Sequence, residues 1–317
     1  MLTCNHPEKV WSKDRNGDWA LTSPAVSIVI PTHDRPEMLT AALESAIAQT
    51  FDDNEIIVVL NGATPDSVRA AERFACRASV HFVRTEYSTV AAARNAGIKR
   101  ACGEWIAFLD DDDLWENRKL AAQMAAARHS GADLIACDFS VFDAHGPIAN
   151  PGLAPLPGGL SYAEALMLGN FVSGGSAAMV RASALRSLGG FDEALINCED
   201  WDMWRRLSWD HAIFIVEERL VRYRRHGANK GLDPERKLIG ESQHFANMLR
   251  DTPPRLHHML GPAKLRFFDS IRSVLTTQSL LREPISPLQF LDSPFRLFDQ
   301  MTFGLMSKVR DSLTRSG

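Results

Sequence analysis

Four consecutive carboxylates, Asp110 to Asp113, follow directly after the apolar run 105–109. A short apolar run bounded by polar residues is typical of a buried strand in an α/β sheet, and open sheets of this class bind ligands at the carboxyl ends of their strands. Adjacent carboxylates repel one another, and a divalent cation, which prefers hard oxygen ligands, relieves that repulsion. Alternatively, the acids are solvated and Asp113 caps a helix that begins at Leu114. The run alone leaves both interpretations open.

Three further polar clusters could take part in the same chemistry. Asp34 and Asn61 follow two other predicted strands, so their side chains are expected at the same sheet edge as the acid run. The pair Glu199 and Asp200 precedes a predicted helix, where acids could also cap the helix or favour its dipole. The basic segment 222–226 ends a strand and offers cations suited to a phosphate-bearing ligand. A metal, a diphosphate and a free carboxylate together indicate group transfer from an activated phosphate ester, because the cation neutralises the leaving group and the carboxylate deprotonates the nucleophile.

An alternation of strands and helices must position these residues. Runs of β-branched and apolar residues predict the strands, and apolar stripes at helical spacing predict the helices. The predicted strands span 27–30, 55–60, 80–83, 105–109, 133–137, 176–180, 213–217 and 220–223. The predicted helices are one that begins at Pro36 and others over 66–76, 90–99, 114–129, 162–168 and 201–208. This rhythm is typical of βαβ units and predicts an α/β protein with a mostly parallel sheet flanked by helices.

The chain divides at two changes of character. Residues 1–24 are predicted to be a loosely ordered leader, residues 25–229 carry the strand–helix alternation, and residues 230–317 are predicted to be a helical C-terminal extension. Helices in the extension are expected over 233–250, 263–280 and 293–312. The last of them has an apolar stripe made of Phe298, Met301, Leu305, Val309 and Leu313, with basic residues nearby. Such a face packs on its own domain, on a second subunit or on an anionic membrane surface, and packing is the commoner use.

The composition indicates which kinds of binding partner and which cellular compartment the protein can have. The chain has 317 residues, 45% of them hydrophobic and 23% charged, and its net charge of -4 argues against nucleic acid as a bulk electrostatic partner. Its five cysteines are scattered without a C-x-x-C pair, which argues against a zinc site or a disulfide framework and fits a reducing compartment. The N-terminus lacks the apolar core of a signal peptide, and no apolar run reaches the ~18 residues of a membrane span. We predict a cytoplasmic protein, with peripheral contact at the inner membrane face left open by the extension.

Several segments together resemble the family 2 glycosyltransferases, which are inverting enzymes of the GT-A fold. The matching segments are 27–32 (SIVIPT), 55–59 (EIIVV), 92–98 (AARNAGI), 103–115 (GEWIAFLDDDDLW), 188–193 (LGGFDE) and 199–202 (EDWD). They follow the family's order and spacing across 27–229, and their agreement is specific where any one alone would be weak. The resemblance implies a GT-A domain, that is, a mostly parallel, Rossmann-like sheet flanked by helices, followed by the helical extension that the match does not cover.

The resemblance also implies a nucleotide-sugar donor and a divalent cation, Mn²⁺ or Mg²⁺. Asp110 and Asp112 match the family's D-x-D motif, with Asp112 as the expected direct metal ligand and Asp110 as the second. The register stays open because Asp111 and Asp113 have the same spacing. His33 is expected against the base, and Arg94 either near the nucleotide or in a structural role. The full set implied for donor binding is Pro31, Thr32, His33, Asp34, Arg35, Asn61, Arg94, Asp110, Asp111, Arg224 and His226.

Asp200 matches the family's catalytic base, with Glu199 as its neighbour. The base would take a proton from an acceptor hydroxyl as that hydroxyl attacks the anomeric carbon from the face opposite the diphosphate, and one displacement inverts the centre. The implied activity is transfer of a sugar from a nucleoside diphosphate donor to a glycan or lipid-linked acceptor, in bacterial polysaccharide or glycoconjugate synthesis.

One position departs from the family pattern. Leu60 stands where relatives carry an acid that often recognises uracil, and leucine cannot hydrogen-bond a base, whereas the neighbouring Asn61 offers both a donor and an acceptor. A uridine donor is therefore not implied. Two other functions remain open. A nucleotidyltransferase would normally carry a Gly-rich phosphate loop, which is absent near 31–36, and an inactive glycan-binding homologue is disfavoured by the presence of Asp112 and Asp200.

Overall fold

The computed structural model describes residues 10–13, 19–77, 79–86, 88–229 and 233–277. It separates into two compact units, residues 1–257 and residues 258–317. Everything described below, apart from helix α9, belongs to the first unit.

The strands and helices follow the alternation expected from the sequence. The strands are β1 (Val10–Lys13), β2 (Trp19–Thr22), β3 (Val26–Thr32), β4 (Asn54–Asn61), β5 (Val80–Thr85), β6 (Trp105–Phe108), β7 (Leu114–Trp115), β8 (Leu134–Asp143), β9 (Gly146–Ile148), β10 (Met179–Arg181) and β11 (Ile213–Arg224). The helices are α1 (Pro36–Ile47), α2 (Pro65–Glu72), α3 (Val90–Arg100), α4 (Lys119–Ser130), α5 (Tyr162–Ala165), α6 (Ala182–Ser187), α7 (Glu199–Leu207), α8 (Pro234–Asp251) and α9 (Leu260–Thr277), with short 3-10 turns η1 (Gly175–Ala177) and η3 (Pro254–Met259).

One mixed sheet of nine strands forms the centre of the described chain, in the order β5-β4-β3-β6-β10-β8-β11-β7, with β9 paired to β8. Its first half, from β5 to β6, is parallel throughout, as predicted. In the second half, β8 and β11 are parallel to each other, whereas β10 runs antiparallel to both β6 and β8. The short β10 gives no sequence signal of its direction, because a buried strand carries the same apolar pattern in either orientation.

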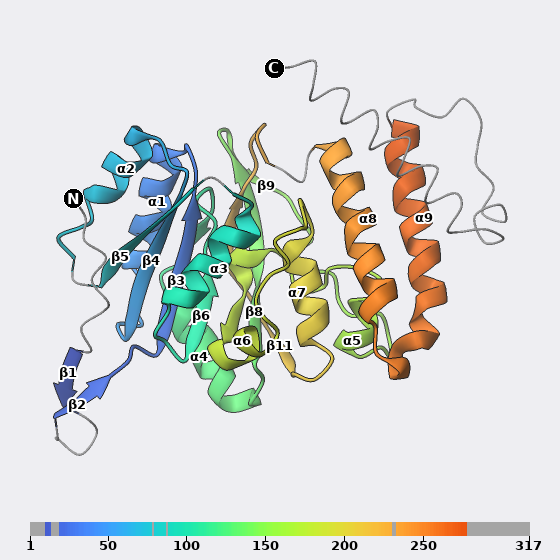
Figure 1. Ribbon diagram of the computed structural model, residues 1–317, viewed down its shortest axis with the longest axis horizontal. Helices are drawn as coiled ribbons and strands as arrows, with labels where there is room; N and C mark the ends of the chain where they lie inside the picture. The colour runs from blue at the N-terminus through green and yellow to red at the C-terminus, as the bar shows by residue number, and fades with distance from the viewer. Residues whose placement is uncertain (1–9, 14–18, 78, 87, 230–232, 278–317) are drawn as a thin grey trace. The chain divides into compact units, whose positions relative to one another are not determined.

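Helices cover both faces of this sheet (Figure 1). On one face, α1 buries the predicted stripe Leu39, Ala42, Leu43 and Ala46 in a core that α4 also enters through Leu120 and Met124. On the other face, α3, α6 and α7 build a second core with Ile98, Leu185 and Met203. The α3 helix lies close to the sheet at Gly97, where an added Cβ would stand 2.3 Å from Val29 Cγ1. This close contact sets the distance between the C-terminal half of α3 and the middle of β3.

Several predicted elements differ from the structure. The strands expected over 213–217 and 220–223 form the single strand β11, and the strand expected over 176–180 is divided between η1 and the three-residue β10. The segment 1–24, expected to be loosely ordered, contains an antiparallel pair formed by β1 and β2. The helix expected to begin at Leu114 begins at Lys119 instead, because Leu114 and Trp115 pair with Arg222 and Val221 of β11 as the two-residue strand β7. A strand of two residues has no periodicity, so the sequence pattern could not separate it from the helix that follows.

The C-terminal region begins with the predicted helices. The α8 and α9 helices correspond to the helices expected over 233–250 and 263–280. The first compact unit extends to residue 257 and so includes α8, which the sequence analysis assigned to the extension. The third helix, 293–312, and its apolar stripe lie outside the described residues. Within the described residues, no helix is both long enough and apolar enough to cross a membrane.

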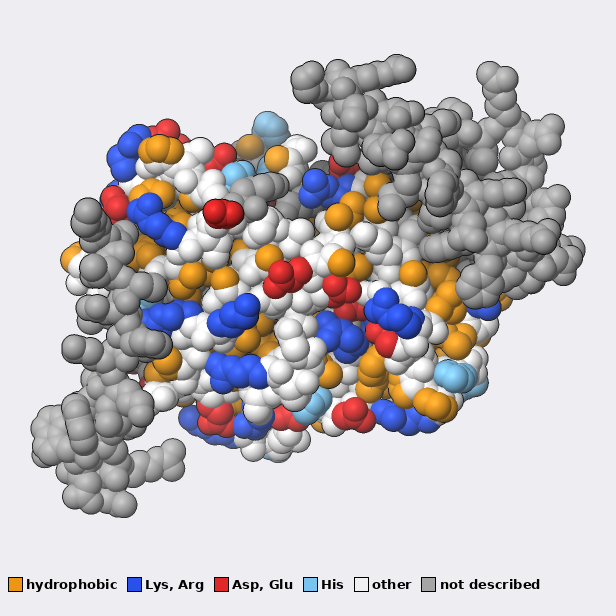
Figure 2. Space-filling model, viewed as in Figure 1, with side chains coloured by type: hydrophobic (Ala, Val, Ile, Leu, Met, Phe, Trp, Pro, Cys, Tyr) orange, Lys and Arg blue, Asp and Glu red, His pale blue; other side chains and the backbone are white. Residues whose placement is uncertain are grey.

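The face of the molecule shown in Figure 2 carries side chains of both charge signs among neutral ones. Lysine and arginine side chains are interspersed with acidic ones there and form no continuous basic stripe. The large hydrophobic side chains that are exposed in the described residues are Phe214, Tyr223 and Leu265, and of these Tyr223 borders the cavity described next.

Candidate active site

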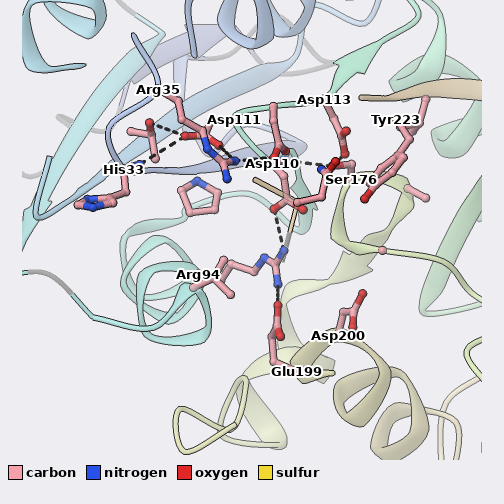
Figure 3. A pocket seen from close by; sticks show the side chains of 18 of the residues that line it. His33, Arg35, Arg94, Asp110, Asp111, Asp113, Ser176, Glu199, Asp200 and Tyr223 are labelled. Atoms are coloured by element: carbon pink, nitrogen blue, oxygen red, sulfur yellow. Dashed lines mark hydrogen bonds and ion pairs between the residues drawn. The ribbon is translucent and has the colours of Figure 1, made fainter. Parts of the chain in front are cut away.

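A cavity of about 510 Å³ opens at the carboxyl ends of β3, β4 and β6 and extends to the start of α7 and the end of β11 (Figure 3). Most of the residues singled out from the sequence border it: Pro31, Thr32, His33, Arg35, Asn61, Arg94, Asp110, Asp111, Asp112, Glu199 and Asp200. Asp34, Arg224 and His226 are not among the lining residues. The fold therefore gathers segments far apart in the sequence around one cavity, as expected for the ligand-binding edge of an open α/β sheet.

The second carboxylate of the acid run, Asp111, holds the loop after β3. Its Oδ2 accepts hydrogen bonds from Thr32 Oγ1 at 2.8 Å and from the His33 backbone N–H at 3.3 Å, and Arg35 Nη1 lies 3.1 Å from its Oδ1. Burial raises the pKa of Asp111 to about 6, against the opposing attraction of Arg35. With both oxygens bonded to protein groups, Asp111 mainly fixes the shape of this loop.

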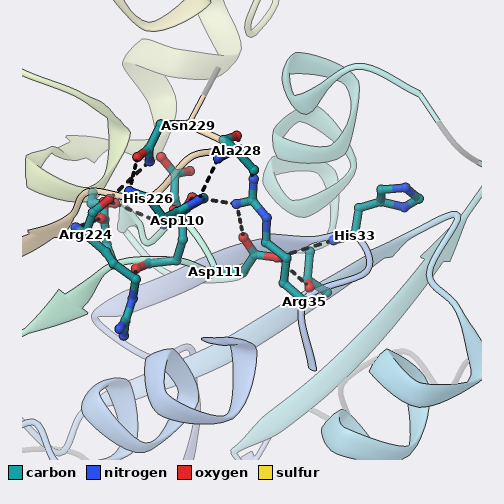
Figure 4. A network of polar contacts seen from close by, with 12 residues as sticks. His33, Arg35, Asp110, Asp111, Arg224, His226, Ala228 and Asn229 are labelled. Atoms are coloured by element: carbon teal, nitrogen blue, oxygen red, sulfur yellow. Dashed lines mark hydrogen bonds and ion pairs between the residues drawn. The ribbon is translucent and has the colours of Figure 1, made fainter. Parts of the chain in front are cut away.

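The third carboxylate, Asp112, bonds two basic side chains, Arg35 and His226, which are labelled in Figure 4. Its Oδ2 is 2.5 Å from Arg35 Nη1 and 3.0 Å from His226 Nε2, while Arg224 Nε donates to its backbone carbonyl at 2.8 Å. Arg224 and His226 thus act on Asp112 without bordering the cavity themselves. The second carboxylate oxygen of Asp112, Oδ1, has no hydrogen bond to any described residue and could therefore bind a ligand.

The fourth carboxylate, Asp113, does not cap a helix, so that prediction was wrong. Its Oδ2 accepts a hydrogen bond from Ser176 Oγ at 2.6 Å, and its Oδ1 accepts one from the Arg224 backbone N–H at 3.0 Å. Ser176 Oγ also accepts the Asp110 backbone N–H at 3.0 Å. Burial, with the charges of Asp112 and Asp110, raises the pKa of Asp113 well above its ordinary value. Asp113 therefore joins the acid run to η1 and β11.

Arg94 connects the acid run to the start of α7. Its side chain is only 3% exposed, and its two terminal nitrogens bond Asp110 Oδ1 at 2.7 Å and Glu199 Oε1 at 2.8 Å. Burial opposes the charge, but the two carboxylates raise the pKa of Arg94, so the guanidinium stays protonated. A Cβ on Gly175 would stand 2.8 Å from Arg94 Nη2, so a glycine there leaves room for this bridge. Arg94 also lines the cavity, so both of the roles expected for it stay predictions.

Asp200 differs from Glu199 although the two are adjacent. Glu199 is neutralised by Arg94, whereas Asp200 accepts a hydrogen bond from the Trp201 backbone N–H at 2.7 Å and is directed into the cavity (Figure 3). Burial and the neighbouring charge of Glu199 raise the pKa of Asp200 to about 7, against the attraction of Arg94. A carboxyl group that titrates near neutral pH is suited to general acid–base chemistry.

Asn61 and His33 both line the cavity and both have hydrogen-bond partners within the protein. The amide of Asn61 donates to Ser88 O at 2.9 Å and accepts from Ser88 N, Ser88 Oγ and Thr85 Oγ1. His33 Nδ1 lies 3.0 Å from Asn61 O, although 42% of its side chain is exposed. Leu60, at 2% exposure, packs in the core. Asp34, outside the cavity lining, accepts the Thr64 backbone N–H at 3.0 Å.

Backbone strain is concentrated around this cavity. In the described part of the chain, the non-glycine residues with positive φ are Asp34 at 48°, Ser173 at 76° and Cys198 at 63°. Ser173 lines the cavity, Asp34 lies between His33 and Arg35, and Cys198 immediately precedes Glu199. Non-glycine residues pay a conformational penalty in this region and persist there when the surroundings enforce it, often at functional sites.

The sequence analysis missed several residues that border the cavity. Ser88, Ser173, Ser176, Asn197 and Tyr223 all line it. The run Ser173-Gly174-Gly175-Ser176 before a strand was the available signal, since paired glycines mark a turn or a close approach of the backbone. The other residues have no local pattern and can be recognised only in the folded chain.

The donor set suits a cation that is shared with a substrate. Among the described residues, no group of three or more His, Cys, Asp and Glu side chains is arranged to hold a metal by itself. Mg²⁺ and ions like it are commonly bound through one or two carboxylates together with substrate phosphates. Asp112, with a free oxygen, and Asp110, with 30% of its side chain exposed, meet that requirement at the cavity wall.

Sequence comparisons place these features in a known family. Residues 27–189 match the family described as glycosyl transferase family 2. The chain is 26% identical over 211 residues to an uncharacterized glycosyltransferase of Rickettsia typhi, covering 65% of each protein. It is 27% identical over 232 residues to chondroitin synthase of Escherichia coli, covering 70% of this chain and 32% of that one. The first curated relatives are matched over 34% to 65% of their own length, so the chain spans less than two thirds of them.

Solved structures show the same fold at low sequence identity. The structure of residues 1–349 of TarS from S. aureus has a TM-score of 0.61 at 16% identity and covers 82% of this chain and 75% of that one. The mannosyltransferase PcManGT from Pyrobaculum calidifontis, in complex with GDP-Man and Mn²⁺, has a TM-score of 0.58 at 17% identity and covers 96% of this chain and 91% of that one. These likenesses confirm the predicted GT-A fold. Because the family match covers just over half of the residues, the chain belongs to glycosyl transferase family 2.

Proposed function

We propose that the protein transfers a sugar from a nucleoside diphosphate sugar to an acceptor hydroxyl with inversion, that Asp200 is the general base, and that a divalent cation binds at Asp112. The observation that carries this proposal is the partly buried Asp200, with a pKa raised to about 7, directed into the same cavity as the acid run. A base poised near the working pH balances the fraction that is deprotonated against its strength as a proton acceptor.

The residues divide the work of a single displacement. Asp200 accepts the proton of the acceptor hydroxyl while that oxygen forms a bond to the anomeric carbon. The bond from that carbon to the diphosphate breaks on the opposite face, and the nucleoside diphosphate leaves with the electron pair. Attack from one face and departure from the other inverts the centre. Arg94 keeps Glu199 and Asp110 paired, so Asp200 remains the carboxylate available for proton transfer.

The leaving group would be held at the other end of the cavity. Asp112, and Asp110 beside it, would hold the cation, which when bound neutralises charge on the departing diphosphate. Arg35 lies on the cavity wall, where it would bind the diphosphate. A guanidinium suits this role because it forms two parallel hydrogen bonds with phosphate oxygens. Support for the donor class comes from relatives of the same fold whose structures hold UDP-GlcNAc, in TarS, and GDP-Man with Mn²⁺, in PcManGT.

The first experiment identifies the donor base. Thermal unfolding is measured with UDP, GDP, CDP and ADP, each with and without Mn²⁺, because a ligand that binds the native state raises the unfolding temperature in proportion to the logarithm of its excess over Kd. We expect one nucleotide to stabilise the protein, with Mn²⁺ required. The variant Asp112→Asn should lose the Mn²⁺-dependent part of that shift. If stabilisation by the nucleotide is the same with and without Mn²⁺ in both proteins, the metal assignment is wrong.

The second experiment tests the base. With the donor identified, Asp200→Asn should lower transfer by about 10²–10⁴-fold while leaving the Kd of the nucleotide unchanged, since the amide keeps the shape but cannot take a proton. Transfer by the wild type should rise with pH around a midpoint near 7, set by the raised pKa of Asp200. A variant that keeps wild-type transfer would exclude Asp200 as the base.

A further inference from the structure

One face of α8 lies against the segment that leads into the proposed base. The residues that contact this segment or α7 are Gly240, Gln243, His244, Asn247 and Asp251. Their spacing of three and four residues places them on a single side of the helix. The family match ends at residue 189, so both α7 and α8 lie beyond it.

Hydrogen bonds from α8 fix the segment 192–198 at two levels. Gln243 Oε1 accepts the Ile196 backbone N–H at 3.2 Å, and Gln243 Nε2 donates to the Ala194 carbonyl at 3.2 Å. One turn further along, Asn247 Nδ2 donates to Asp192 Oδ2 at 2.8 Å. A single glutamine thus satisfies a donor and an acceptor of a non-helical backbone, which would otherwise need water or another partner.

The contact between α8 and this segment also includes Asn197, the residue before the left-handed Cys198. A Cβ on Gly240 would stand 2.4 Å from Asn197 Cβ, so the two backbones approach each other as closely as a glycine allows. Asn197 lines the cavity, and Cys198 after it has the left-handed φ of 63° that turns the chain into α7. The position of α8 therefore sets the position of this turn.

The other side of the base is held by the same helix. The fully buried Arg205 bonds Asp251 Oδ1 of α8 at 3.0 Å and Asp202 Oδ1 at 2.8 Å. The ring of His244 lies against the ring of Trp201, with 4.4 Å between the centroids. Asp200 lies between Asn197, which is packed on α8, and Trp201 and Asp202, which are anchored to it.

We propose that α8 is the positioning element of the catalytic base: it holds the turn 196–198 and the first turn of α7 so that the Asp200 carboxylate faces the cavity. Gln243 is its central positioning residue. This inference rests on the proposed role of Asp200. It extends the functional unit into a helix that the family's sequence motifs do not include, and it gives α8 a role distinct from oligomer or membrane contact.

Gln243→Ala in the full chain tests the proposal. Ser242→Ala is the matched control, because within the described residues Ser242 Oγ bonds the Leu238 carbonyl of its own helix and nothing on α7. Three quantities are measured: the hydrogen exchange of the 192–202 amides, the Kd of the stabilising nucleoside diphosphate with Mn²⁺, and the kcat and KM of transfer. We expect faster exchange across 192–202 and an unchanged nucleotide Kd. The kcat should fall by about tenfold or more, because a small displacement of a catalytic group lowers the rate of the chemical step by such factors. Gln243→Glu, which keeps the acceptor for Ile196 N–H, should recover part of the kcat.

Each outcome decides the matter. Wild-type kcat in Gln243→Ala, or a parallel loss of kcat and nucleotide binding, would overturn the positioning role. If Gln243→Ala does not fold, Asn247→Ala, which removes the bond one turn away, replaces it with the same expectations. If Asp200 is not the base, Asp200→Asn retains transfer. If α8 does not position the base, Asp200→Asn still loses transfer, but the α8 variants show slow hydrogen exchange across 192–202 and a normal kcat.

Discussion

Two groups of adjacent carboxylates border the cavity, Asp110–Asp113 and Glu199–Asp200, and the protein pairs them to very different extents. In the first group, each carboxylate has at least one charged or hydroxyl partner, drawn from Arg94, Arg35, His226, Ser176 and Thr32. In the second, Glu199 has Arg94, while the hydrogen bond that Asp200 makes within the described residues comes from a backbone N–H of its own helix turn. The number of charged or hydroxyl partners therefore distinguishes the two kinds of carboxylate. One with such partners holds the shape of the site, whereas one without them can exchange a proton.

The largest expected effect comes from removing the residue that joins the two groups. Arg94→Met keeps most of the side-chain volume but leaves Asp110 and Glu199 without their buried counter-charge. Breaking a buried ion pair from one side destabilises by about 3–5 kcal/mol, which urea unfolding can measure. In the double variant Arg94→Met with Glu199→Gln, part of the loss should return because one unpaired charge is gone.

Arg186→Met is the control for that comparison. Arg186 donates to the Ala101 carbonyl at 2.7 Å and to the Ile98 carbonyl at 3.4 Å, and it bonds no carboxylate among the described residues. Its loss should be about 1 kcal/mol, the usual net value of a hydrogen bond. Equal losses at Arg94 and Arg186 would show that charge pairing at the cavity does not separate the two groups.

A smaller effect is expected at Ser176, whose hydroxyl bonds Asp110 and Asp113 of the acid run. Ser176→Ala leaves the buried Asp113 without its 2.6 Å hydrogen bond and the Asp110 N–H without its acceptor. An unsatisfied buried polar group costs about 1–3 kcal/mol, so the midpoint of urea unfolding should fall accordingly. The matched control is Ser187→Ala, whose hydroxyl bonds the Ala184 carbonyl within its own helix and should change stability by less than about 0.5 kcal/mol.

An effect of the opposite sign, seen as a pH dependence of stability, is expected at Asp200. Its pKa is about 7 in the native state and near 3.8 in the unfolded chain, so between these values the native protein retains a proton that the unfolded chain releases. Stability therefore falls as pH rises through this window, and the penalty is complete above it. Asp200→Asn removes the penalty and should stabilise the protein at pH ~8 but not at pH ~4. Paired unfolding curves at the two pH values check the sign, and equal stabilisation at both would contradict the raised pKa.

Much of the fold and the outline of the site followed from local pattern. Apolar runs located the strands of the parallel half, and acids directly after them located the cavity edge that Asp110 to Asp113 now border. The direction of β10 and the two-residue β7 could not be predicted, because each depends on pairing with strands far away in the sequence. Asp113 shows the consequence: its partners Ser176 and Arg224 are 63 and 111 residues away, so a nearby helix start was the wrong explanation.

The same limit applies to individual roles in the site. Asn61 has the donor and acceptor that a base would need, but Ser88 and Thr85 occupy its amide in the folded chain. Arg94 could be placed near the nucleotide or in a structural role, and its two buried ion pairs are visible only once α3 and α7 meet. Residue type predicts what a side chain can do, whereas the competing partners that decide what it does come from the tertiary fold.

The bridge made by Arg94 also sets a rule for recombining this protein with its relatives. The arginine comes from α3, and its two carboxylates come from the loop after β6 and from the first turn of α7. A chimaera with a crossover between residues 94 and 199 would inherit the cation from one parent and a carboxylate from the other. Crossovers should therefore lie outside this interval, or both parents should carry the same three residues, so that donor and acceptor specificities are exchanged without separating the buried charges.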